Sequence, residues 1–303
     1  MGFLRKCVLK LLYVTGLYLW VFSAVNKTFS LNILSAKETI NQIKKGRTLI
    51  RFGDGELRLI MKVGEAGFQK RNSRLEADLA EILVSCRKTG GENILLCMPG
   101  VLSGSQREYQ LTKDVSFWWF VFAVKYFRKL RSLFLSCGGI SFGDSFVSRP
   151  YYAIRDFEFA SYVFAEFKNI FSGKRLLIIE GRLTRFGVGN DLLDGAISVR
   201  RILGPEVDAY DKVDEIYESA KGEICDIVLI ALGPAAKILA YRLNELGYCC
   251  LDVGHLDIQY EWYKMNAKEK IAIANKYVNE SKEKFVETGD IDESYERQVV
   301  CRF

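Results

Sequence analysis

Histidine is almost absent from this sequence, and its cysteines do not occur in metal-binding pairs. The 303 residues contain one histidine, His255, and eight cysteines, none of them in a CxxC arrangement. A single histidine excludes His-rich metal sites and leaves a Cys–His pairing or a general base. Most of the cysteines lie in apolar, strand-like runs, where a thiol behaves as a small hydrophobic group. We therefore expect buried, reduced cysteines in a cytoplasmic protein.

Long runs of lysine and arginine with interleaved aromatic residues are also missing, which argues against a protein that binds nucleic acid. Lys plus Arg number 43 against 37 for Asp plus Glu, a modest excess that still suits small anionic ligands. Neither a GxGxxG nor a Walker motif is present, so NAD binding and P-loop ATP hydrolysis lose support. With 49% apolar and 26% charged residues, the composition is that of a folded globular protein.

Residues 1–34 differ from the rest of the sequence because they are both basic and hydrophobic. We interpret them as a helix whose basic end meets anionic lipid headgroups at a membrane surface, with a single-pass anchor and a plain core helix as alternatives. The apolar stretch after Lys10 is shorter than the roughly 20 residues of a spanning helix. Phe22 argues against a cleaved signal peptide, because it stands where a signal peptidase needs a small residue. Lys6 argues against myristoylation, because it stands where that modification needs Ser or Thr.

Apolar runs that read as strands alternate with helical stretches along the rest of the chain. Such runs, each closed by glycine, suit a parallel sheet with both faces covered. The pattern predicts an α/β fold with a Rossmann-like, doubly wound, mostly parallel sheet in a single catalytic domain at 35–285. Residues 286–303 are expected to form an acidic tail that is solvated or loosely docked. Strands are predicted at 48–52, 93–99, 175–181, 198–205, 226–234 and 249–254, and helices at 35–45, 210–221, 235–246 and 266–284.

The sequence RFGDGE at 51–56 follows the first of these central strands. Its acids, Asp54 and Glu56, are one residue apart, so in an extended turn both side chains can reach one cation. Carboxylate oxygens are the ligands that Mg²⁺ and Mn²⁺ prefer. Asp-Gly is also a common hairpin turn, and taken alone the motif favours the turn. The motifs at the other strand ends favour the metal site over the turn, because in a parallel sheet the carboxyl ends of the strands meet at the same edge. Arg51 then becomes a phosphate contact, and Gly53 gives the ligand room to approach.

Two further motifs at strand ends suit a diphosphate. ALGPAAK at 231–237 places Gly233 and Pro234 where a strand passes into a helix, which is typical of an anion site. EGRLTRFGVGNDLL at 180–193 supplies Arg182 and Arg185 as phosphate contacts. Its Asn190 is either a helix cap or a ligand contact.

VGHLDIQYEW at 253–262 brings the single histidine close to two acids, Asp257 and Glu261. His255 is a candidate third metal ligand or phosphate contact, and the alternative is a side chain that satisfies a local hydrogen bond. An acceptor hydroxyl would need a general base, for which Asp257, Glu261 and Glu180 are the candidates.

Taken together, these motifs resemble those of the GT-D-type glycosyltransferases. This bacterial family has a Rossmann-like sheet and an Asp-x-Glu motif that binds a metal with a nucleotide sugar. The resemblance runs in the family's order through about four-fifths of the chain. One departure is Gln259, because the family commonly has an acid directly before Tyr-Glu-Trp, which puts a catalytic role of this position in doubt. The matching pieces are RFGDGE at 51–56, FQ at 68–69, SRPY at 148–151, EGRLTRFGVGNDLL at 180–193, ALGPAAKILAYRL at 231–243 and GYCCLDVGHLDIQYEW at 247–262.

The resemblance implies a metal-dependent glycosyltransferase that moves a sugar from a nucleotide-sugar donor, first of all a UDP-sugar, to a glycan or lipid-linked acceptor. The product would belong to a surface polysaccharide or a glycoprotein glycan, made on the cytoplasmic side, with the enzyme attached to the inner face of the plasma membrane. Mn²⁺ or Mg²⁺ would bind Asp54 and Glu56, and His255 is the residue to test as a third ligand. Donor contacts would come from Arg51, Gly53, Arg149, Arg182, Arg185, Asn190, Gly233 and Pro234.

Two other functions stay open on these residues. A metal-dependent phosphohydrolase also uses acids at strand ends with Mg²⁺, and it would release phosphate from simple phosphoesters without a sugar acceptor. A non-catalytic protein that binds nucleotide sugars or glycans would bind the donor without turnover.

Overall fold

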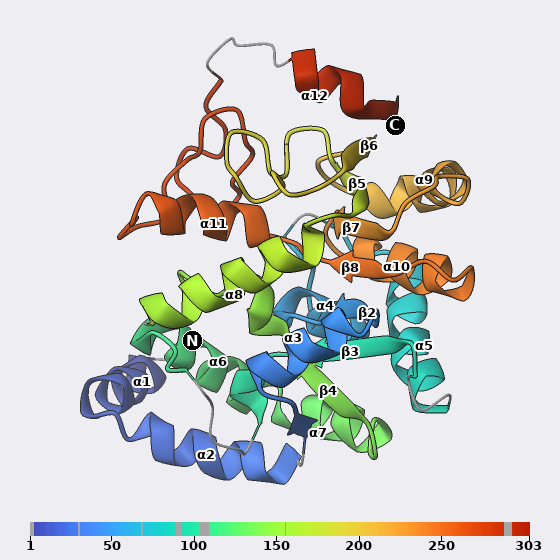
Figure 1. Ribbon diagram of the computed structural model, residues 1–303. Helices are drawn as coiled ribbons and strands as arrows, with labels where there is room; N and C mark the ends of the chain where they lie inside the picture. Colours follow the sequence, from blue (N-terminus) through green and yellow to red (C-terminus); the bar gives the residue numbers. More distant parts are fainter. Residues whose placement is uncertain are drawn as a thin grey trace.

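The computed structural model describes residues 3–29, 31–67, 69–88, 92–103, 109–154, 156–287 and 293–303. In this part of the chain nine strands form one sheet in the order β1-β4-β3-β2-β8-β7-β5-β6-β9, and neighbouring strands pair in parallel (Figure 1). The predicted α/β fold with a mostly parallel sheet is confirmed. The strands are β1 (Asn32–Ile33), β2 (Thr48–Arg51), β3 (Ile94–Met98), β4 (Ser141–Asp144), β5 (Arg175–Gly181), β6 (Ser198–Gly204), β7 (Ile227–Ala231), β8 (Cys250–Asp252) and β9 (Val299–Arg302).

Helices cover both faces of this sheet. Figure 1 shows α5, α9 and α10 along one side and α3 and α8 along the other. The central strands are therefore buried, and Leu177, Ile178 and Ile179 of β5 have no exposed surface. The helices are α1 (Phe3–Thr15), α2 (Tyr18–Phe29), α3 (Ala36–Lys44), α4 (Asp54–Ile60), α5 (Ser73–Lys88), α6 (Lys113–Lys125), α7 (Phe127–Ser136), α8 (Phe157–Phe171), α9 (Val213–Ala220), α10 (Ala235–Glu245), α11 (Leu256–Lys264) and α12 (Glu293–Gln298), with 3-10 turns η1 (Gly100–Leu102), η2 (Ser145–Ser148) and η3 (Ala209–Lys212).

The middle of the sheet brings together two strands that are distant in the sequence, β2 and β8. Leu49 pairs with Leu251, and the Thr48 hydroxyl accepts the N–H of Cys250 at 2.9 Å. From β2 the sheet continues outward through β3 and β4, whereas β5 to β8 build the other half. A sheet whose strand order reverses between two neighbours opens a crevice at their carboxyl ends. Arg51 and Asp252 end these two strands and therefore lie at that crevice.

The N-terminal segment forms two helices and not the single hydrophobic helix that we expected. Gly16, with φ +74°, separates α1 from α2, and the segments Cys7–Thr15 and Tyr18–Phe29 are bent by 96°. Among the described residues, no single helix has both the length and the apolar character needed to cross a bilayer; the bent pair does only when its helices are taken together. One face of the pair is docked, since Tyr18 and Phe22 are buried against Phe120 of α6.

The predicted helix at 266–284 is wrong. The segment consists of turns and short bridges that cross α11, and its first turn and the turn at Asn275 both contain positive φ angles. The reason is tertiary packing. Ile273 and Val278 are buried, and the Lys276 ammonium reaches the carboxylates of α11. A charged composition favours a helix, but the side chains inside the protein require an irregular path.

The expectation of a solvated or loosely docked C-terminal tail is also wrong for residues 293–303. β9 pairs in parallel with β6 and forms an edge of the sheet. Tyr295 of α12 is buried, with its ring 4.8 Å from the Arg201 guanidinium. Residues 288–292, Phe68 of the FQ motif, and residues 1–2 and 30 of the N-terminal segment lie outside the described part of the chain. The predicted boundaries at 34/35 and 285/286 stay predictions.

Candidate active site

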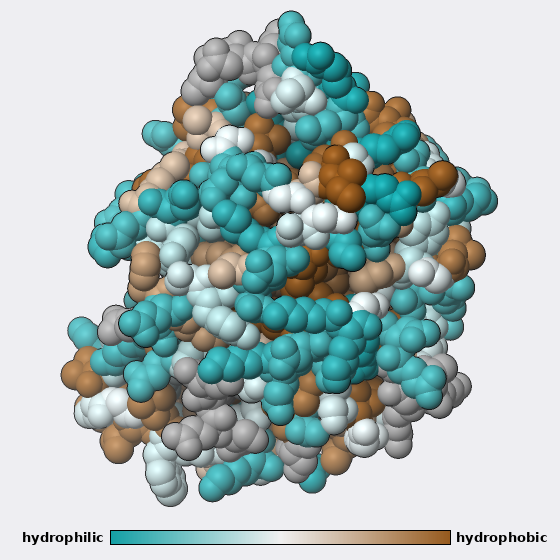
Figure 2. Space-filling view, viewed as in Figure 1, coloured by the Kyte–Doolittle hydropathy of each residue, from teal (hydrophilic) through white to brown (hydrophobic). Residues whose placement is uncertain are grey.

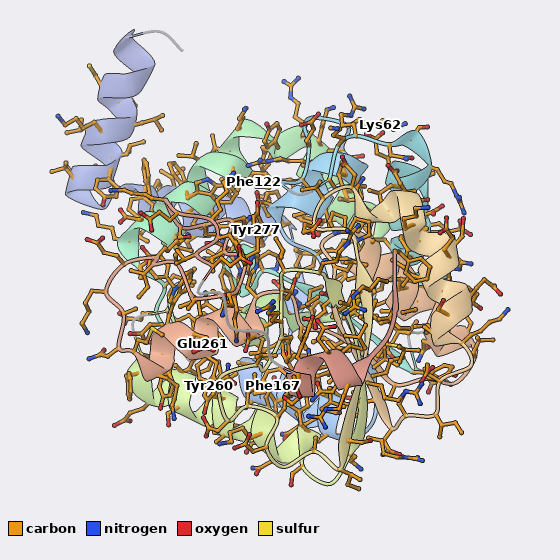
Figure 3. All side chains as sticks on the ribbon, turned by 90° about the horizontal axis from the view of Figure 1, so that it is seen from above. Lys62, Phe122, Phe167, Tyr260, Glu261 and Tyr277 are labelled. Atoms are coloured by element: carbon orange, nitrogen blue, oxygen red, sulfur yellow. The ribbon has the colours of Figure 1, made fainter. Side chains whose placement is uncertain are left out.

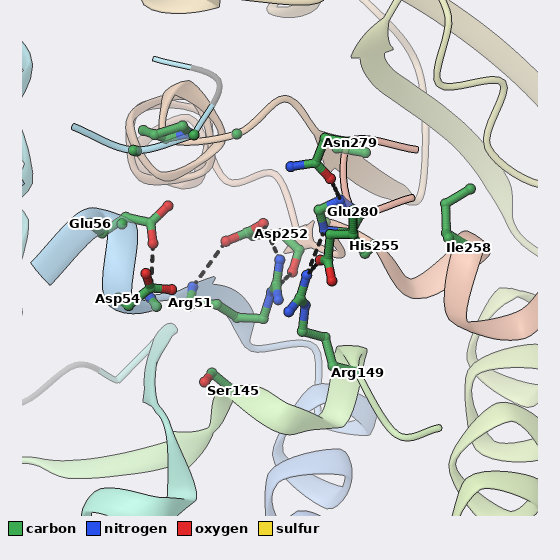
Figure 4. Close-up of a pocket in the computed structure, with 18 of the residues that line it drawn as sticks. Arg51, Asp54, Glu56, Ser145, Arg149, Asp252, His255, Ile258, Asn279 and Glu280 are labelled. Atoms are coloured by element: carbon green, nitrogen blue, oxygen red, sulfur yellow. Dashed lines mark hydrogen bonds and ion pairs between the residues drawn. The ribbon is translucent and has the colours of Figure 1, made fainter. Parts of the chain in front are cut away.

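A cleft of about 830 Å³ lies at the carboxyl ends of the strands, at the crevice between β2 and β8 (Figure 4). This volume is in the range of sites that hold a small ligand, roughly 300–1,000 Å³. The strand-end segments RFGDGE at 51–56, IIEGR at 178–182, ALGP at 231–234 and DVGHLD at 252–257 all contribute residues to its lining, as their positions at strand ends predict. Of the predicted site residues, the cleft is lined by Arg51, Gly53, Asp54, Glu56, Arg149, Gly233, Pro234, His255 and Asp257.

The RFGDGE motif does not form the extended turn that we expected. β2 ends at Arg51, Gly53 caps the next helix, and Asp54 is already the first residue of α4. The Glu56 side chain folds back, and its Oε2 accepts the N–H of Gly53 at 2.9 Å. Because residues two apart on a helix point to different sides, the two acids do not face the same way. The correction concerns their orientation, since both still line the cleft.

Asp54 is the more accessible acid of this pair. Its side chain is 40% exposed and lies 3.2 Å from the Arg58 guanidinium, one helical turn further along α4. Desolvation raises the pKa of the Asp54 carboxyl, and the neighbouring Glu56 adds to this, while Arg58 lowers it. An acid in this position is stabilised by an additional cation, because a cation would favour its charged form.

A buried ionic network lies behind the two acids and was missed by the sequence analysis. The ammonium of Lys237, on the first turn of α10, is 3.0 Å from Glu56 Oε1 and 3.1 Å from Asp252 Oδ2. Asp252 also accepts the backbone N–H of Arg51 at 3.1 Å and pairs with its guanidinium at 2.9 Å. The pKa of Asp252 is lowered because Arg51 and Lys237 together outweigh the effect of burial. The network therefore joins α4, β2, β8 and α10 at the crevice.

Arg51 lines the cleft and belongs to this network, and its role as a phosphate contact stays a prediction. Its Nε donates to the Asp252 carbonyl at 2.6 Å, and its remaining nitrogens reach the Asp252 carboxylate and the Ser148 hydroxyl. The guanidinium is thus held by protein groups on the cleft wall. Gly254 is needed beside it, because φ is +48° there and an added Cβ would lie 2.1 Å from Arg51 Nη2.

His255 lies on the other side of the Arg51–Asp252 pair from the two acids (Figure 4). Its Nδ1 is 3.2 Å from Arg149 Nη2, and its Nε2 is 3.0 Å from Asn279 Oδ1. Burial, with the neighbouring Arg149, lowers the pKa of the imidazole to about 3. Within the described ranges, no group of three His, Cys, Asp or Glu side chains is placed to hold a metal. The structure therefore brings Asp54 and Glu56 together but does not bring His255 to them.

The His255 side of the cleft carries positive charge. Arg149 pairs with Glu280 and lines the cleft, and burial lowers the pKa of its guanidinium to about 10, so that it stays charged at neutral pH. Lys270 also lines the cleft and pairs with Glu280. No sequence pattern pointed to Lys270, because it belongs to the segment that was expected to be a helix.

The N-terminus of α10 faces the cleft beside these charges. Gly233, with φ +55°, turns the chain from β7 into the helix, and Pro234 is its N-cap. Both residues line the cleft as predicted. The backbone N–H groups and the dipole at such a helix start favour an anion.

The other predicted residues form a structural layer beside the cleft. Asn190 donates to Asp257 and to Glu261 at 2.7 Å each, and Lys276 reaches both acids at 2.7 and 2.8 Å. Glu180 is fully buried, accepts the N–H of Phe186 at 2.7 Å and lies 2.6 Å from Arg201. Of the three proposed bases, Asp257 lines the cleft, whereas Glu180 and Glu261 are not among its lining residues.

The two arginines of the 180–193 motif also point elsewhere. Arg182 donates to the carbonyl of Phe303 at 2.8 Å, and the Arg185 guanidinium lies 5.6 Å from the ring of Tyr295. Neither lines the cleft. They secure the C-terminal segment, which sequence patterns placed outside the fold. Of the predicted donor-binding arginines, Arg51 and Arg149 line the cleft, and Arg182 and Arg185 do not.

Gln259 joins α11 to the SRPY segment. Its side-chain oxygen accepts the N–H groups of Tyr151 at 3.2 Å and Tyr152 at 2.8 Å. A carboxylate oxygen can accept the same two bonds. The residue therefore keeps a positioning role at the place where an acid is common in the family.

Comparisons with known proteins agree with this arrangement. Residues 49–281 match the family model named Glycosyltransferase GT-D fold. The chain is 34% identical over 274 residues to "Probable glycosyl transferase Gly" of Streptococcus gordonii, covering 89% of this chain and 39% of that protein. It is 34% identical over 279 residues to "Glycosyltransferase GlyD" of Streptococcus pneumoniae, covering 90% and 33%. The chain thus spans between a third and two fifths of the length of these relatives.

Solved structures show the same likeness over nearly their whole length. A glycosyltransferase from Streptococcus sanguinis superposes with a TM-score of 0.79 at 32% identity, covering 90% of this chain and 100% of that chain. A domain described as having a distinct glycosyltransferase fold superposes with a TM-score of 0.81 at 31% identity, covering 93% and 99%. The class that the fold and the motifs define is therefore the glycosyltransferase GT-D fold. This chain belongs to the family with the GT-D fold, as the motifs predicted.

Proposed function

We propose that this protein transfers a sugar, first of all from a UDP-sugar, to a glycan or lipid-linked acceptor, with Mn²⁺ or Mg²⁺ as cofactor. The proposal rests on the residues that line one cleft. An accessible acid, Asp54, shares it with a helix N-terminus at Gly233 and Pro234 and with the cations Arg149 and Lys270. An acid for a metal, together with donors for a diphosphate, is what a nucleotide sugar requires.

The chemistry of the donor set fits a hard divalent cation. Asp54 offers an accessible carboxylate whose pKa is raised by desolvation, and Glu56 is the second acid of the same turn. Mg²⁺-type ions are commonly held by one or two carboxylates, with water and substrate phosphates completing the coordination. When bound, such an ion would offset the negative charge that develops on the leaving nucleotide.

The residues of the chain have separate roles in this proposal. Arg149 and Lys270 bind and orient the diphosphate together with the N–H groups at the start of α10. Lys237 pairs with both Glu56 and Asp252 and thereby fixes the first turn of α4, which presents Asp54. Asp257 is the proposed base that lines the cleft, but its oxygens already accept bonds from Gly187, Asn190 and Lys276. Accepting a proton there requires release of one of these bonds, so its first role is to position the Gly187 loop.

Two tryptophans on α6, of which Trp118 is exposed, provide a surface for the acceptor. Trp118 is 40% exposed and lines the cleft together with Trp119. The Arg58 guanidinium lies 5.7 Å from the Trp118 ring, so this wall adjoins the Asp54 turn. The apolar face of a sugar ring can pack on such a surface while its hydroxyls remain hydrated. We propose that the acceptor glycan binds along α6, opposite the start of α10.

A thermal-shift panel of UDP-, GDP- and dTDP-sugars, each with and without Mn²⁺, tests the donor site. We expect one donor to raise the unfolding temperature, and Mn²⁺ to enlarge that shift, because a ligand that binds the native state stabilises it. Asp54→Asn should remove the Mn²⁺-dependent part, whereas Asp211→Asn, an exposed acid on η3, should keep it. No shift with any donor would contradict the proposal, and phosphate release from simple phosphoesters would point to a phosphohydrolase instead.

A further inference from the structure

Large exposed apolar side chains lie on both N-terminal helices and in the turn between them. Trp20 is 78% exposed and Leu11 60% exposed. In Figures 1 and 3 the violet helix α1 stands at the periphery of the protein, and Figure 2 shows hydrophobic residues at the lower left, where α1 lies. A cluster of this kind marks an interaction surface. We call it the N-terminal apolar surface; its residues are Val8, Leu11, Val14, Leu17, Leu19 and Trp20.

The opposite side of this helix pair is firmly attached to the catalytic domain. The Tyr13 hydroxyl donates to Asp114 at 2.5 Å, and the Tyr13 ring meets Phe117 edge to face at 5.0 Å. The Lys113 ammonium lies 4.3 Å from the same ring. α2 also packs against α6 and α7. The four helices therefore form one corner, and the N-terminal apolar surface is its outer side.

The same corner carries the positive charge of the whole protein. The spans of α1, α2, α6 and α7 contain nine lysines and arginines and a single acid, Asp114. Their balance of +8 exceeds the +6 of the whole chain, so the rest of the protein is slightly acidic. No Asp or Glu precedes Glu38 in the sequence. The exposed cations Lys10, Arg128 and Arg131 therefore belong to the same four helices as the exposed apolar side chains.

We propose that this corner binds an anionic lipid bilayer, with the N-terminal apolar surface inserted among the headgroups. Apolar side chains, an exposed tryptophan and surrounding cations are the features that hold a helix in the interfacial plane of a membrane. Charge selects this occupant over a second copy of the chain, because two corners of +8 repel each other. The bent helix pair lies on the bilayer and does not cross it.

Membrane binding would place the cleft next to the lipid. α6 contacts the helix pair through Lys113, Asp114 and Phe117, and the same helix lines the cleft through Asp114, Trp118 and Trp119. A sugar chain on a membrane-bound carrier would then reach α6 directly from the bilayer. This consequence rests on the proposed transferase activity, whereas membrane binding itself does not.

Vesicle co-sedimentation tests the proposal without donor or acceptor. We expect the protein to pellet with vesicles of phosphatidylcholine mixed with phosphatidylglycerol, and at least about tenfold less with phosphatidylcholine alone, with binding weakened by salt. The double variant Leu11→Ser/Trp20→Ser should bind the mixed vesicles about tenfold more weakly. The matched control is Ile197→Ser/Ile224→Ser, which removes two equally exposed side chains elsewhere and should bind like the wild type.

A second pair of variants and a fluorescent label separate charge from insertion. Arg128→Glu/Arg131→Glu should weaken binding at low salt and have little effect at high salt. Cys7, the exposed cysteine on α1, carries an environment-sensitive dye whose emission should shift to the blue with mixed vesicles. Absence of pelleting, equal binding of the Leu11→Ser/Trp20→Ser variant, or an unshifted dye would overturn the proposal. So would a vesicle-free dimer that depends on Trp20, seen by sedimentation velocity.

Discussion

Replacing Lys237 by methionine tests whether the buried ionic network holds the first turn of α4, which carries Asp54 and Glu56. The Lys237 side chain is 5% exposed and contacts two carboxylates, Glu56 and Asp252, which are 12% and 1% exposed. Methionine keeps most of the apolar stem but removes the charge. Asp252 retains Arg51, whereas Glu56 retains only the N–H of Gly53. Breaking a buried ion pair from one side costs about 3 kcal/mol or more, because the remaining charge loses its partner.

The loss of stability in Lys237→Met should become smaller as the pH falls. In the wild type the pKa of Asp252 is lowered, so its stabilisation is present above its unfolded pKa and is lost as pH falls through the folded value. In Lys237→Met the carboxylates can regain stability by taking up protons. The difference in the free energy of unfolding between variant and wild type should therefore be largest near pH 7 and shrink towards pH 4.

Urea unfolding followed by circular dichroism between pH 4 and pH 8 measures this difference. In a separate thermal unfolding experiment at pH 7, the unfolding temperature of Lys237→Met should lie about 6 °C below that of the wild type, at about 2 °C per kcal/mol for a chain of this size. Lys221→Met is the matched control, because Lys221 is 46% exposed and its partner Glu218 60% exposed, and surface pairs contribute little. A Lys237→Met variant as stable as this control at pH 7, or a deficit that does not change with pH, would refute the reasoning.

Three further predictions follow from buried or exposed groups. The single histidine signal in proton NMR should not titrate between pH 5 and 8, because the pKa of His255 is lowered to about 3; a midpoint near 6.5 would contradict this. Since unfolded His255 binds a proton more readily, its contribution to stability is present above about pH 6.5 and is lost as pH falls, by up to about 1.4 kcal/mol per pH unit. Thiol labelling of the native protein should modify the exposed Cys7 first, whereas Cys97 and Cys250, whose thiol pKa is raised by burial, should react only on unfolding; prompt labelling of either would count against the core packing. Glu180→Gln should lower the free energy of unfolding by about 3 kcal/mol, because Arg201 loses its buried partner, while the affinity for the donor stays unchanged; a weaker affinity at wild-type stability would restore a direct role in the site.

The sheet was predictable from the sequence because its strands are continuous apolar runs that end at glycine. Burial on both faces demands such runs, and the chain from 175 to 254 provides four of them. Their shared direction then predicted one edge where Asp54, Gly233 and His255 would be found. These inferences needed only local patterns and the geometry of a parallel sheet.

The rest depended on contacts between distant segments. Lys237 is the charged residue in the run AAKILA, a readable anomaly, but its partners Glu56 and Asp252 come from other elements. The orientation of Glu56 was also readable, since a glutamate three residues after Gly53 is a capping signal. The segment 266–284 carries no such local signal. Its irregular path depends on the burial of Lys276 against α11, a contact that the local sequence does not show.

Release of nucleotide from the donor selected by the thermal-shift panel, measured with and without Mn²⁺, tests the central claim most directly. The account predicts release that requires Mn²⁺ and that falls at least about 100-fold in Asp54→Asn, with the unfolding temperature of the variant unchanged. The Asp211→Asn control should release nucleotide like the wild type. Full activity of Asp54→Asn, or equal release without a divalent cation, would contradict the assignment of this cleft as a metal-dependent nucleotide-sugar site.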